Sequence, residues 1–176
     1  MKYRVGIITL SDKGAAGLRE DKSGPLIRQI LEEDGRYQVE EEIILSDDRK
    51  GLEEELRRMA DDAGLELILT TGGTGFSPRD NTPEATMAVA TRNVPGIAEY
   101  MRAKSFEITP KGMLSRAASV IRNRTLIINL PGSPKAVREN LGFIMPAMAH
   151  GLDILLERDG ECGSDDHHHH DHHNHK

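Results

Sequence analysis

A glycine-rich segment near the middle of the chain carries residue types that suit phosphate binding. Residues 70–75 read Thr-Thr-Gly-Gly-Thr-Gly, and Arg79 and Asp80 follow shortly after them. Glycines let phosphate oxygens approach backbone N–H groups, which point at a ligand where a strand ends and a helix begins. Such a loop alone is a weak signal, because glycine also serves turn geometry without binding anything. The adjoining Arg79 and Asp80 favour a binding site.

Acidic side chains are expected close to this loop. Asp12 and Asp47 follow apolar segments that end at Leu10 and Leu45, and Asp80 lies in the glycine-rich loop itself. Two carboxylates from separate loops can hold Mg²⁺ through oxygen and water ligands. Glycine N–H groups and one or two cations can offset the charge of a reacting phosphate. These residues therefore indicate magnesium-assisted chemistry on a triphosphate.

Each candidate residue also has a structural alternative. An aspartate or serine before a helix can be only a cap, Asn129 can brace a turn, and Arg116 can be a surface charge. A Ser-His-Asp triad is not expected, because His150 is the only histidine outside the C-terminal segment, and the chain has no P-loop Gly-Lys-Ser/Thr. The candidate residues nevertheless lie together at strand ends, which favours a functional site. This site would contain Asp12, Asp47, Asp80, Ser115, Arg116, Asn129, Ser133 and Lys135.

Alternating strand and helix patterns must position these residues. Thr82, Pro83 and Glu84 read as a helix start with Thr82 as the cap, and Pro146 should kink or split the last helix. The alternation predicts a three-layer, doubly wound α/β fold with a mostly parallel sheet, a C-terminal β-hairpin and helices. Strands are expected over residues 5–10, 37–45, 65–69, 119–121 and 125–128, and helices begin near residues 23, 48, 82, 95 and 134.

The composition excludes several classes of protein. The 176 residues suit one domain, and the formal net charge of -6 argues against general binding to a nucleic-acid backbone. A single cysteine, Cys162, excludes an internal disulfide and fits a reducing compartment. The apolar run over residues 5–10 is too short for a signal peptide or a membrane span. The sequence therefore predicts a cytoplasmic protein that binds neither nucleic acid nor membranes.

Two loop motifs together resemble the MogA/MoaB family. The first is the glycine-rich stretch with residues 78–86, Pro-Arg-Asp-Asn-Thr-Pro-Glu-Ala-Thr, and the second is residues 129–135, Asn-Leu-Pro-Gly-Ser-Pro-Lys. Residues 11–12, 21–24 and 114–116 are also similar to the family, and the likeness covers roughly residues 3–157. The family includes the MogA-type molybdopterin adenylyltransferases and the G domains of gephyrin and its plant counterpart.

The resemblance implies a trimeric enzyme of molybdenum cofactor synthesis. Such enzymes transfer AMP from Mg-ATP to the terminal phosphate of molybdopterin and release pyrophosphate, and a molybdate-inserting protein is an implied partner. Asp47 and Asp80 match the two essential carboxylates of the family, which implies metal binding and activation. The positions that match the nucleotide and pterin sites are Ser11, Asp12, Gly72, Gly73, Thr74, Gly75, Ser115, Asn129, Pro131, Gly132 and Ser133.

The family leaves one alternative open. MoaB-type members need not have the activity, so a pterin-binding homologue without adenylyl transfer is the second interpretation. The spacing over residues 11–22 is more similar to MogA, and the presence of both Asp47 and Asp80 favours an active enzyme.

The C-terminal segment has a composition of its own. Residues 1–158 are expected to form the folded domain, and residues 159–176 a disordered, acidic, His-rich tail. Asp171 and Asn174 interrupt the histidines, unlike a usual purification tag, and closely spaced imidazoles would chelate Ni²⁺, Zn²⁺ or Cu²⁺ loosely. A further alternative is therefore a metal-handling protein that binds through His167, His168, His169, His170, His172, His173 and His175.

Overall fold

Six strands form one sheet in the order β2-β1-β3-β6-β5-β4 in a computed structural model of the protein, which describes residues 1–158. The first four strands in this order are parallel, whereas β5 is antiparallel to β6 and to β4. The predicted mostly parallel sheet with a C-terminal hairpin is confirmed. The strands are β1 (Tyr3–Leu10), β2 (Tyr37–Leu45), β3 (Leu67–Thr71), β4 (Arg92–Asn93), β5 (Ser119–Arg122) and β6 (Thr125–Leu130).

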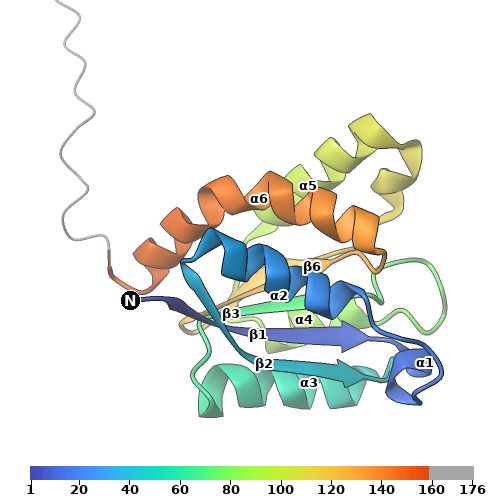
Figure 1. Ribbon diagram of the computed structural model, residues 1–176, viewed down its shortest axis with the longest axis horizontal. Coiled ribbons are helices and arrows are strands. Elements are labelled where there is room, and N and C mark those ends of the chain that lie inside the picture. Colours follow the sequence, from blue (N-terminus) through green and yellow to red (C-terminus); the bar gives the residue numbers. More distant parts are fainter. Residues whose placement is uncertain (159–176) are drawn as a thin grey trace, which may run out of the picture.

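Helices cover both faces of the sheet and produce three layers (Figure 1). Leu67 and Leu69 of β3 belong to one hydrophobic cluster and Ile68 to the other, because successive side chains of a strand point to opposite faces. Both faces of the central strands are thus apolar and covered. One face carries α2 (Ser23–Asp34), α5 (Pro95–Ile108) and α6 (Pro134–Leu155), and the other carries α3 (Arg49–Arg57) and α4 (Thr82–Val89).

Short elements complete the described part of the chain. A single α-helical turn follows β1, a π-helical turn continues α3, and a 3₁₀ turn follows α5. Gly35 ends α2 in a left-handed conformation with φ 87°, which glycine adopts readily at a helix end. None of the helices in residues 1–158 is long and apolar enough to cross a membrane. The short elements are α1 (Asp12–Ala15), η1 (Arg58–Asp62) and η2 (Pro110–Leu114).

One predicted detail is wrong, and another is wrong in part. Pro146 does not split α6, which runs unbroken from Pro134 to Leu155, whereas the kink stays a prediction. One lost backbone hydrogen bond is outweighed by the buried stripe that α6 packs on the sheet. Thr82 does not cap α4, because its hydroxyl instead donates to the Gly72 carbonyl at 3.0 Å, and Asn81 occupies the cap position. The hydroxyl of Thr82 therefore fixes the glycine-rich loop.

Two neighbouring tyrosines at the start of β1 and β2 differ in their hydrogen bonds. The Tyr3 hydroxyl lies 3.1 Å from the Ala149 carbonyl and also contacts the Asp153 carboxylate, to either of which it can donate. The Tyr37 hydroxyl is buried and has no partner among residues 1–158. The two rings lie in one cluster, with centroids 5.3 Å apart. The Tyr3 hydroxyl therefore has hydrogen-bond partners, whereas the buried Tyr37 hydroxyl has none within residues 1–158.

Removal of each hydroxyl should have a different effect on stability. We expect Tyr3→Phe to lower the free energy of unfolding by about 1 kcal/mol, because it removes a hydrogen bond. Tyr37→Phe should be neutral or stabilising, because it removes a buried polar group that lacks a partner. Chemical denaturation of both variants measures the difference. An equal loss in the two variants would contradict this account of the hydroxyls.

Both tyrosines should also make the fold sensitive to alkaline pH. Burial and the Asp153 hydrogen bond raise the pKa of Tyr3 to about 12, and burial raises the pKa of Tyr37 to about 12. A phenol whose pKa is raised on folding stabilises the fold below its unfolded pKa of about 10 and loses that contribution as pH rises further. The free energy of unfolding should therefore fall between about pH 10 and about pH 12, and less steeply in Tyr37→Phe. Identical slopes in that variant and the wild type would exclude a contribution from Tyr37.

Candidate functional site

Four parallel strands end side by side at one edge of the sheet, and the candidate residues follow these ends. Leu10 of β1 pairs with Leu45 of β2, and Thr9 pairs with Thr71 of β3, which in turn pairs with Leu130 of β6. The loops after the strands therefore start at the same level. At this edge, which we call the rim, lie Ser11 and Asp12, Asp47, residues 72–80, and residues 131–133.

The glycine-rich loop follows a path that side chains would block. Gly72 and Gly73 have φ values of 96° and 70°, in the left-handed region that favours glycine. A Cβ on Gly72 would lie 2.5 Å from the Leu10 carbonyl oxygen, and one on Gly73 would lie 2.2 Å from Thr82 Oγ1. The two glycines thus have a structural reason to be present, and their small size also keeps the backbone of the loop accessible from the rim.

The second predicted loop, residues 131–133, packs against the first. Thr71 Oγ1 donates to the Pro131 carbonyl at 2.6 Å, and Ser23 Oγ donates to the Gly132 carbonyl at 2.8 Å. A Cβ on Gly132 would lie 3.4 Å from the glycine-rich loop. Ser133 caps α6, as the sequence predicts. The two motifs are therefore neighbours in space.

Asp12 and Asp47 are tied together across the ends of β1 and β2. The Asp12 N–H donates to Asp47 Oδ2 at 3.1 Å, and the Asp47 N–H donates to Asp12 Oδ1 at 2.9 Å. Arg79 adds a bidentate contact to the Asp12 carboxylate, with Nε at 3.0 Å and Nη2 at 2.7 Å. The hydrogen bond from Arg79 and that from the Asp47 backbone lower the pKa of Asp12.

Asp47 and its neighbour Asp48 have separate roles. Asp48 caps α3, where its Oδ2 accepts the Gly51 N–H at 3.1 Å. Asp47 points toward the glycine-rich loop, and its Oδ1 lies 3.3 Å from the place where a Cβ on Gly73 would stand. Asp47 is therefore the carboxylate of this pair that the fold directs to the rim.

Asp80 lies against the same loop. Its Oδ2 accepts the Ser77 N–H at 3.1 Å and stands 2.9 Å from the position of a Cβ on Gly75. The pKa of Asp47 is raised, mainly by burial, and the negative charges of Asp12 and Asp80 raise it further. Asp47 and Asp80 therefore lie on the same side of the molecule, close enough for their charges to repel each other. The sequence predicts this proximity.

Arg116 braces the glycine-rich loop from behind. Its Nε donates to the Gly75 carbonyl at 2.9 Å, and its Nη2 donates to the Asp80 carbonyl at 2.7 Å. Its Nη1 pairs with Glu84 at 2.5 Å, and its backbone N–H donates to the Thr74 carbonyl at 2.9 Å. The guanidinium is thus engaged with the loop, whereas the sequence predicts a group that faces the ligand.

Other predicted residues have partners inside the protein. Asn129 is buried, and its Nδ2 donates to the hydroxyls of Thr70 and Thr86, each at 2.9 Å. The hydroxyls of Ser11 and Ser115 each accept a hydrogen bond from a backbone N–H. An accepting hydroxyl can still donate its proton to a ligand. Asn129 therefore ties β6 to β3 and α4 instead of bracing a turn, and the two serines are compatible with both a structural and a binding role.

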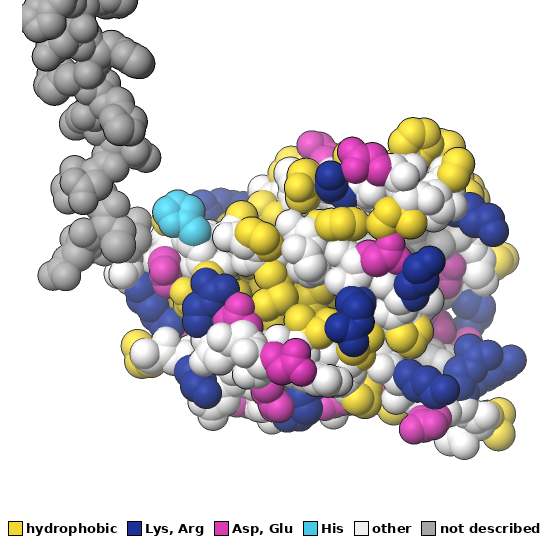
Figure 2. Space-filling view, turned by 45° about the horizontal axis from the view of Figure 1, so that its top comes forward, with side chains coloured by type: hydrophobic (Ala, Val, Ile, Leu, Met, Phe, Trp, Pro, Cys, Tyr) yellow, Lys and Arg dark blue, Asp and Glu magenta, His cyan; other side chains and the backbone are white. Residues whose placement is uncertain are grey.

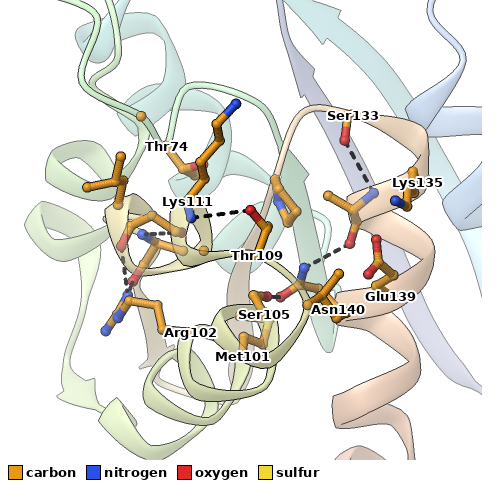
Figure 3. A pocket seen from close by; sticks show the side chains of 18 of the residues that line it. Thr74, Met101, Arg102, Ser105, Thr109, Lys111, Ser133, Lys135, Glu139 and Asn140 are labelled. Carbon is orange, nitrogen blue, oxygen red and sulfur yellow. Dashed lines mark hydrogen bonds between the residues drawn. The ribbon is translucent and has the colours of Figure 1, made fainter.

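Two cavities flank the glycine-rich loop. The first has a volume of about 460 Å³ and lies between this loop, α5, η2 and the start of α6. Figure 3 shows Lys111 on one side of it and Lys135 with Glu139 on the other. The second, of about 600 Å³, adjoins α2 and carries Arg19 and Lys22. Ser133 lines both.

The sequence alone does not identify several of the residues that line these cavities. Lys111 lies in a segment whose shape the sequence leaves open, and Glu139 reads as an ordinary exposed residue of a helix. Arg19 lies in a polar segment before α2. No local pattern marks these side chains, because only the packing of η2, α6 and the loop after α1 brings them to the cavities.

Comparison with known protein families gives a match over most of the chain. A family model described as a probable molybdopterin binding domain matches residues 6–150. The chain belongs to this family. The predicted resemblance, which rests on the two loop motifs, is confirmed.

Individual members of the molybdopterin-binding family are similar over nearly the whole described chain. A molybdopterin adenylyltransferase of Helicobacter pylori (strain J99) is 41% identical over 158 residues, which are 86% of this chain and 87% of the relative. Gephyrin of Dictyostelium discoideum is 38% identical over 162 residues, 88% of this chain, but the chain spans only 23% of gephyrin. The crystal structure of the molybdopterin biosynthesis enzyme MoaB of Thermus thermophilus is 46% identical, with a TM-score of 0.84, 88% coverage of this chain and 97% of that chain.

The donor set at the rim fits a magnesium ion that arrives with a nucleotide. Within residues 1–158, no three His, Cys, Asp or Glu side chains are close enough to enclose a metal ion by themselves. Mg²⁺ in nucleotide sites usually has one or two carboxylates, the substrate phosphates and several waters as ligands. Asp47 and Asp80 suit this arrangement. The histidines predicted as ligands in the tail, residues 167–175, lie outside the described residues.

Gly73→Ala should disrupt the loop of this molybdopterin-binding domain. The left-handed φ costs an alanine about 1–2 kcal/mol, and the contact with Thr82 Oγ1 adds to this loss of stability. Gly142→Ala is the control, because a Cβ there meets nothing within 4 Å, and alanine should stabilise the interior of α6 by about 0.5–1 kcal/mol. Thermal unfolding compares the two variants. Equal stability of both would show that the loop tolerates a side chain at residue 73.

Proposed function

We propose that this protein is a molybdopterin adenylyltransferase of molybdenum cofactor biosynthesis. The reaction transfers AMP from ATP to the terminal phosphate of molybdopterin and releases pyrophosphate. One observation carries the proposal: Asp47 and Asp80 come from separate strand ends and lie against one glycine-rich loop between two cavities. The similarity of about 40% to proteins with this activity supports it.

The chemistry requires alignment and charge neutralisation more than a strong base. A phosphate oxygen of molybdopterin attacks the α-phosphorus of ATP, a new P–O bond forms, and the bond to the β-phosphate breaks, so pyrophosphate leaves with its electron pair. Bound Mg²⁺ supplies neutralisation of the phosphate charge, and Asp47 and Asp80 would hold it. The backbone N–H groups of residues 73–75 would receive phosphate oxygens at the rim, whereas the Gly72 N–H already donates to the Leu130 carbonyl at 3.2 Å.

The two cavities offer space for two substrates. Their volumes of about 460 and about 600 Å³ lie in the range of small-molecule sites. They adjoin at Ser133 and flank the glycine-rich loop, so phosphates held from both sides would meet there. Lys111 and Lys135 in the first cavity, and Arg19 and Lys22 in the second, would offset the charge of anionic substrates.

The proposal extends to assembly and location. We propose the homotrimer that the family resemblance implies, a cytoplasmic location with access to ATP, and a molybdate-inserting protein as a partner. An apolar groove of about 540 Å³ between α5 and α6 supports association, and it contains Tyr100, Phe143 and Leu155. Figure 2 shows hydrophobic side chains between charged ones on the face that carries these helices.

A pterin-binding homologue without adenylyl transfer is the second candidate. The 46% identity to the MoaB structure of Thermus thermophilus favours it. The two candidates differ in turnover: the enzyme releases pyrophosphate from ATP in the presence of Mg²⁺ and molybdopterin, whereas the second candidate binds molybdopterin without this release.

Asparagine substitutions at the two rim carboxylates test the proposed enzyme. Asp47→Asn and Asp80→Asn should each slow magnesium-dependent pyrophosphate release by about 100-fold or more, because each removes a charge that holds the metal in the transition state. Asp48→Asn is the matched control and should retain normal release, because asparagine caps a helix as well as aspartate does. Binding of molybdopterin by the wild type without any release would favour the second candidate. Normal release by both rim variants would remove Asp47 and Asp80 from the mechanism.

A further inference from the structure

Arg79 and Asp12 form an exposed bidentate ion pair across the rim. The guanidinium contacts both carboxylate oxygens, at 3.0 and 2.7 Å, while the two side chains remain 61% and 45% exposed. Exposed pairs of this kind contribute little to stability, because water and salt screen the attraction between the two charges. The stability of the fold therefore gives little reason for this contact.

Each of the two loops joined by the pair is already held by other bonds. The Asp12 loop is fixed by the two reciprocal hydrogen bonds with Asp47, at 3.1 and 2.9 Å. The loop that carries Arg79 is closed by Asp80, whose carboxylate accepts the Ser77 N–H and whose N–H donates to the Ser77 carbonyl at 2.9 Å. The guanidinium of Arg79 can thus move without releasing either loop.

The charges around Arg79 supply a reason for the pair. Asp12, Asp47 and Asp80 concentrate negative charge at the rim, and Arg79 is the cation in direct contact with it. A divalent cation would compete with the guanidinium for these carboxylates. The planar guanidinium fork also fits phosphate oxygens as well as it fits a carboxylate.

We propose that Arg79 exchanges partners, pairing with Asp12 in the ligand-free protein and with the nucleotide polyphosphate once Mg-ATP binds. The exchange releases the Asp12 carboxylate from Arg79 as the metal arrives, while the Asp47 N–H stays bonded to it, and turns Arg79 into a phosphate ligand. No covalent bond changes in this step. The inference rests on the proposed function, because it takes Mg-ATP as the ligand of the rim.

Binding measurements on charge variants test the exchange. In Arg79→Gln, the affinity for Mg²⁺ alone should rise several-fold, because the competing cation is gone, while the affinity for ATP with excess Mg²⁺ should fall about tenfold. Arg79→Lys keeps the charge but not the fork, so Mg²⁺ affinity should stay near that of the wild type and Mg-ATP affinity should fall. Arg36→Gln is the control: Arg36 makes a bidentate pair with Asp34, at 2.7 and 2.8 Å, at the other end of β2, although the Asp34 side chain is less exposed than that of Asp12. Calorimetry on the full chain gives both affinities.

The opposite shifts in Arg79→Gln are decisive. If its Mg²⁺ and Mg-ATP affinities fall together, or neither differs from those of Arg36→Gln, the exchange is wrong, even where the wild type releases pyrophosphate. If the opposite shifts occur but the wild type releases no pyrophosphate, the exchange stands and adenylyl transfer fails. The two proposals therefore fail on different measurements.

Discussion

Four hydrogen-bonded parallel strands end at the same level of the sheet, and the candidate site depends on this constraint. β1 lies between β2 and β3, and β6 continues the row, so residues beyond Leu10, Leu45, Thr71 and Leu130 emerge together. The register of the central strands matters, because a shift by one residue would move the side chains of β1 and β3 from one hydrophobic cluster to the other, where different neighbours surround them. Asp12, Asp47 and the glycine-rich loop follow three different strands, and the pairing of these strands brings them to the same level.

Close backbone packing gives the two loop motifs a double role. Gly72 lies against the carbonyl of Leu10 and beside Gly132, so the loops after β1, β3 and β6 are packed as one unit. Thr82 and Arg116 bind the carbonyls of Gly72 and Gly75 and thereby fix the loop from the other side. The carbonyl groups of the glycine-rich loop thus accept hydrogen bonds from inside the protein. The side of the loop that faces the rim remains available to a ligand. The same residues thus build the turn and shape the site, and structural and functional interpretations of them do not compete.

Local patterns predict much of the fold and part of the site. Apolar runs mark β1 and β2, Ser133 and Asp48 mark helix starts, and the convergence of Asp12, Asp47 and Asp80 follows from the strand order rule for such sheets. The direction of Arg116, the hydroxyl of Thr82 and the partners of Asn129 could not be predicted, because each contacts residues that are distant in the chain. β4 has only two residues, Arg92 and Asn93, both exposed, so it lacks the apolar alternation that marks a strand.

The charge of the rim explains why metal and nucleotide belong together in the proposed site. The chain has a formal net charge of -6, and Asp12, Asp47 and Asp80 add local negative charge where a triphosphate would bind. A bare polyanion would meet repulsion there, and the lysines of the flanking cavity stand at its walls. A divalent cation held by Asp47 and Asp80 would replace this repulsion with attraction to the phosphates. Burial raises the pKa of Asp47 and makes its ionised form costly, and a bound cation would offset that cost further than the Asp12 N–H and Arg79 do. In the proposed site, the acidic rim should therefore favour a nucleotide that carries its metal over a bare nucleotide.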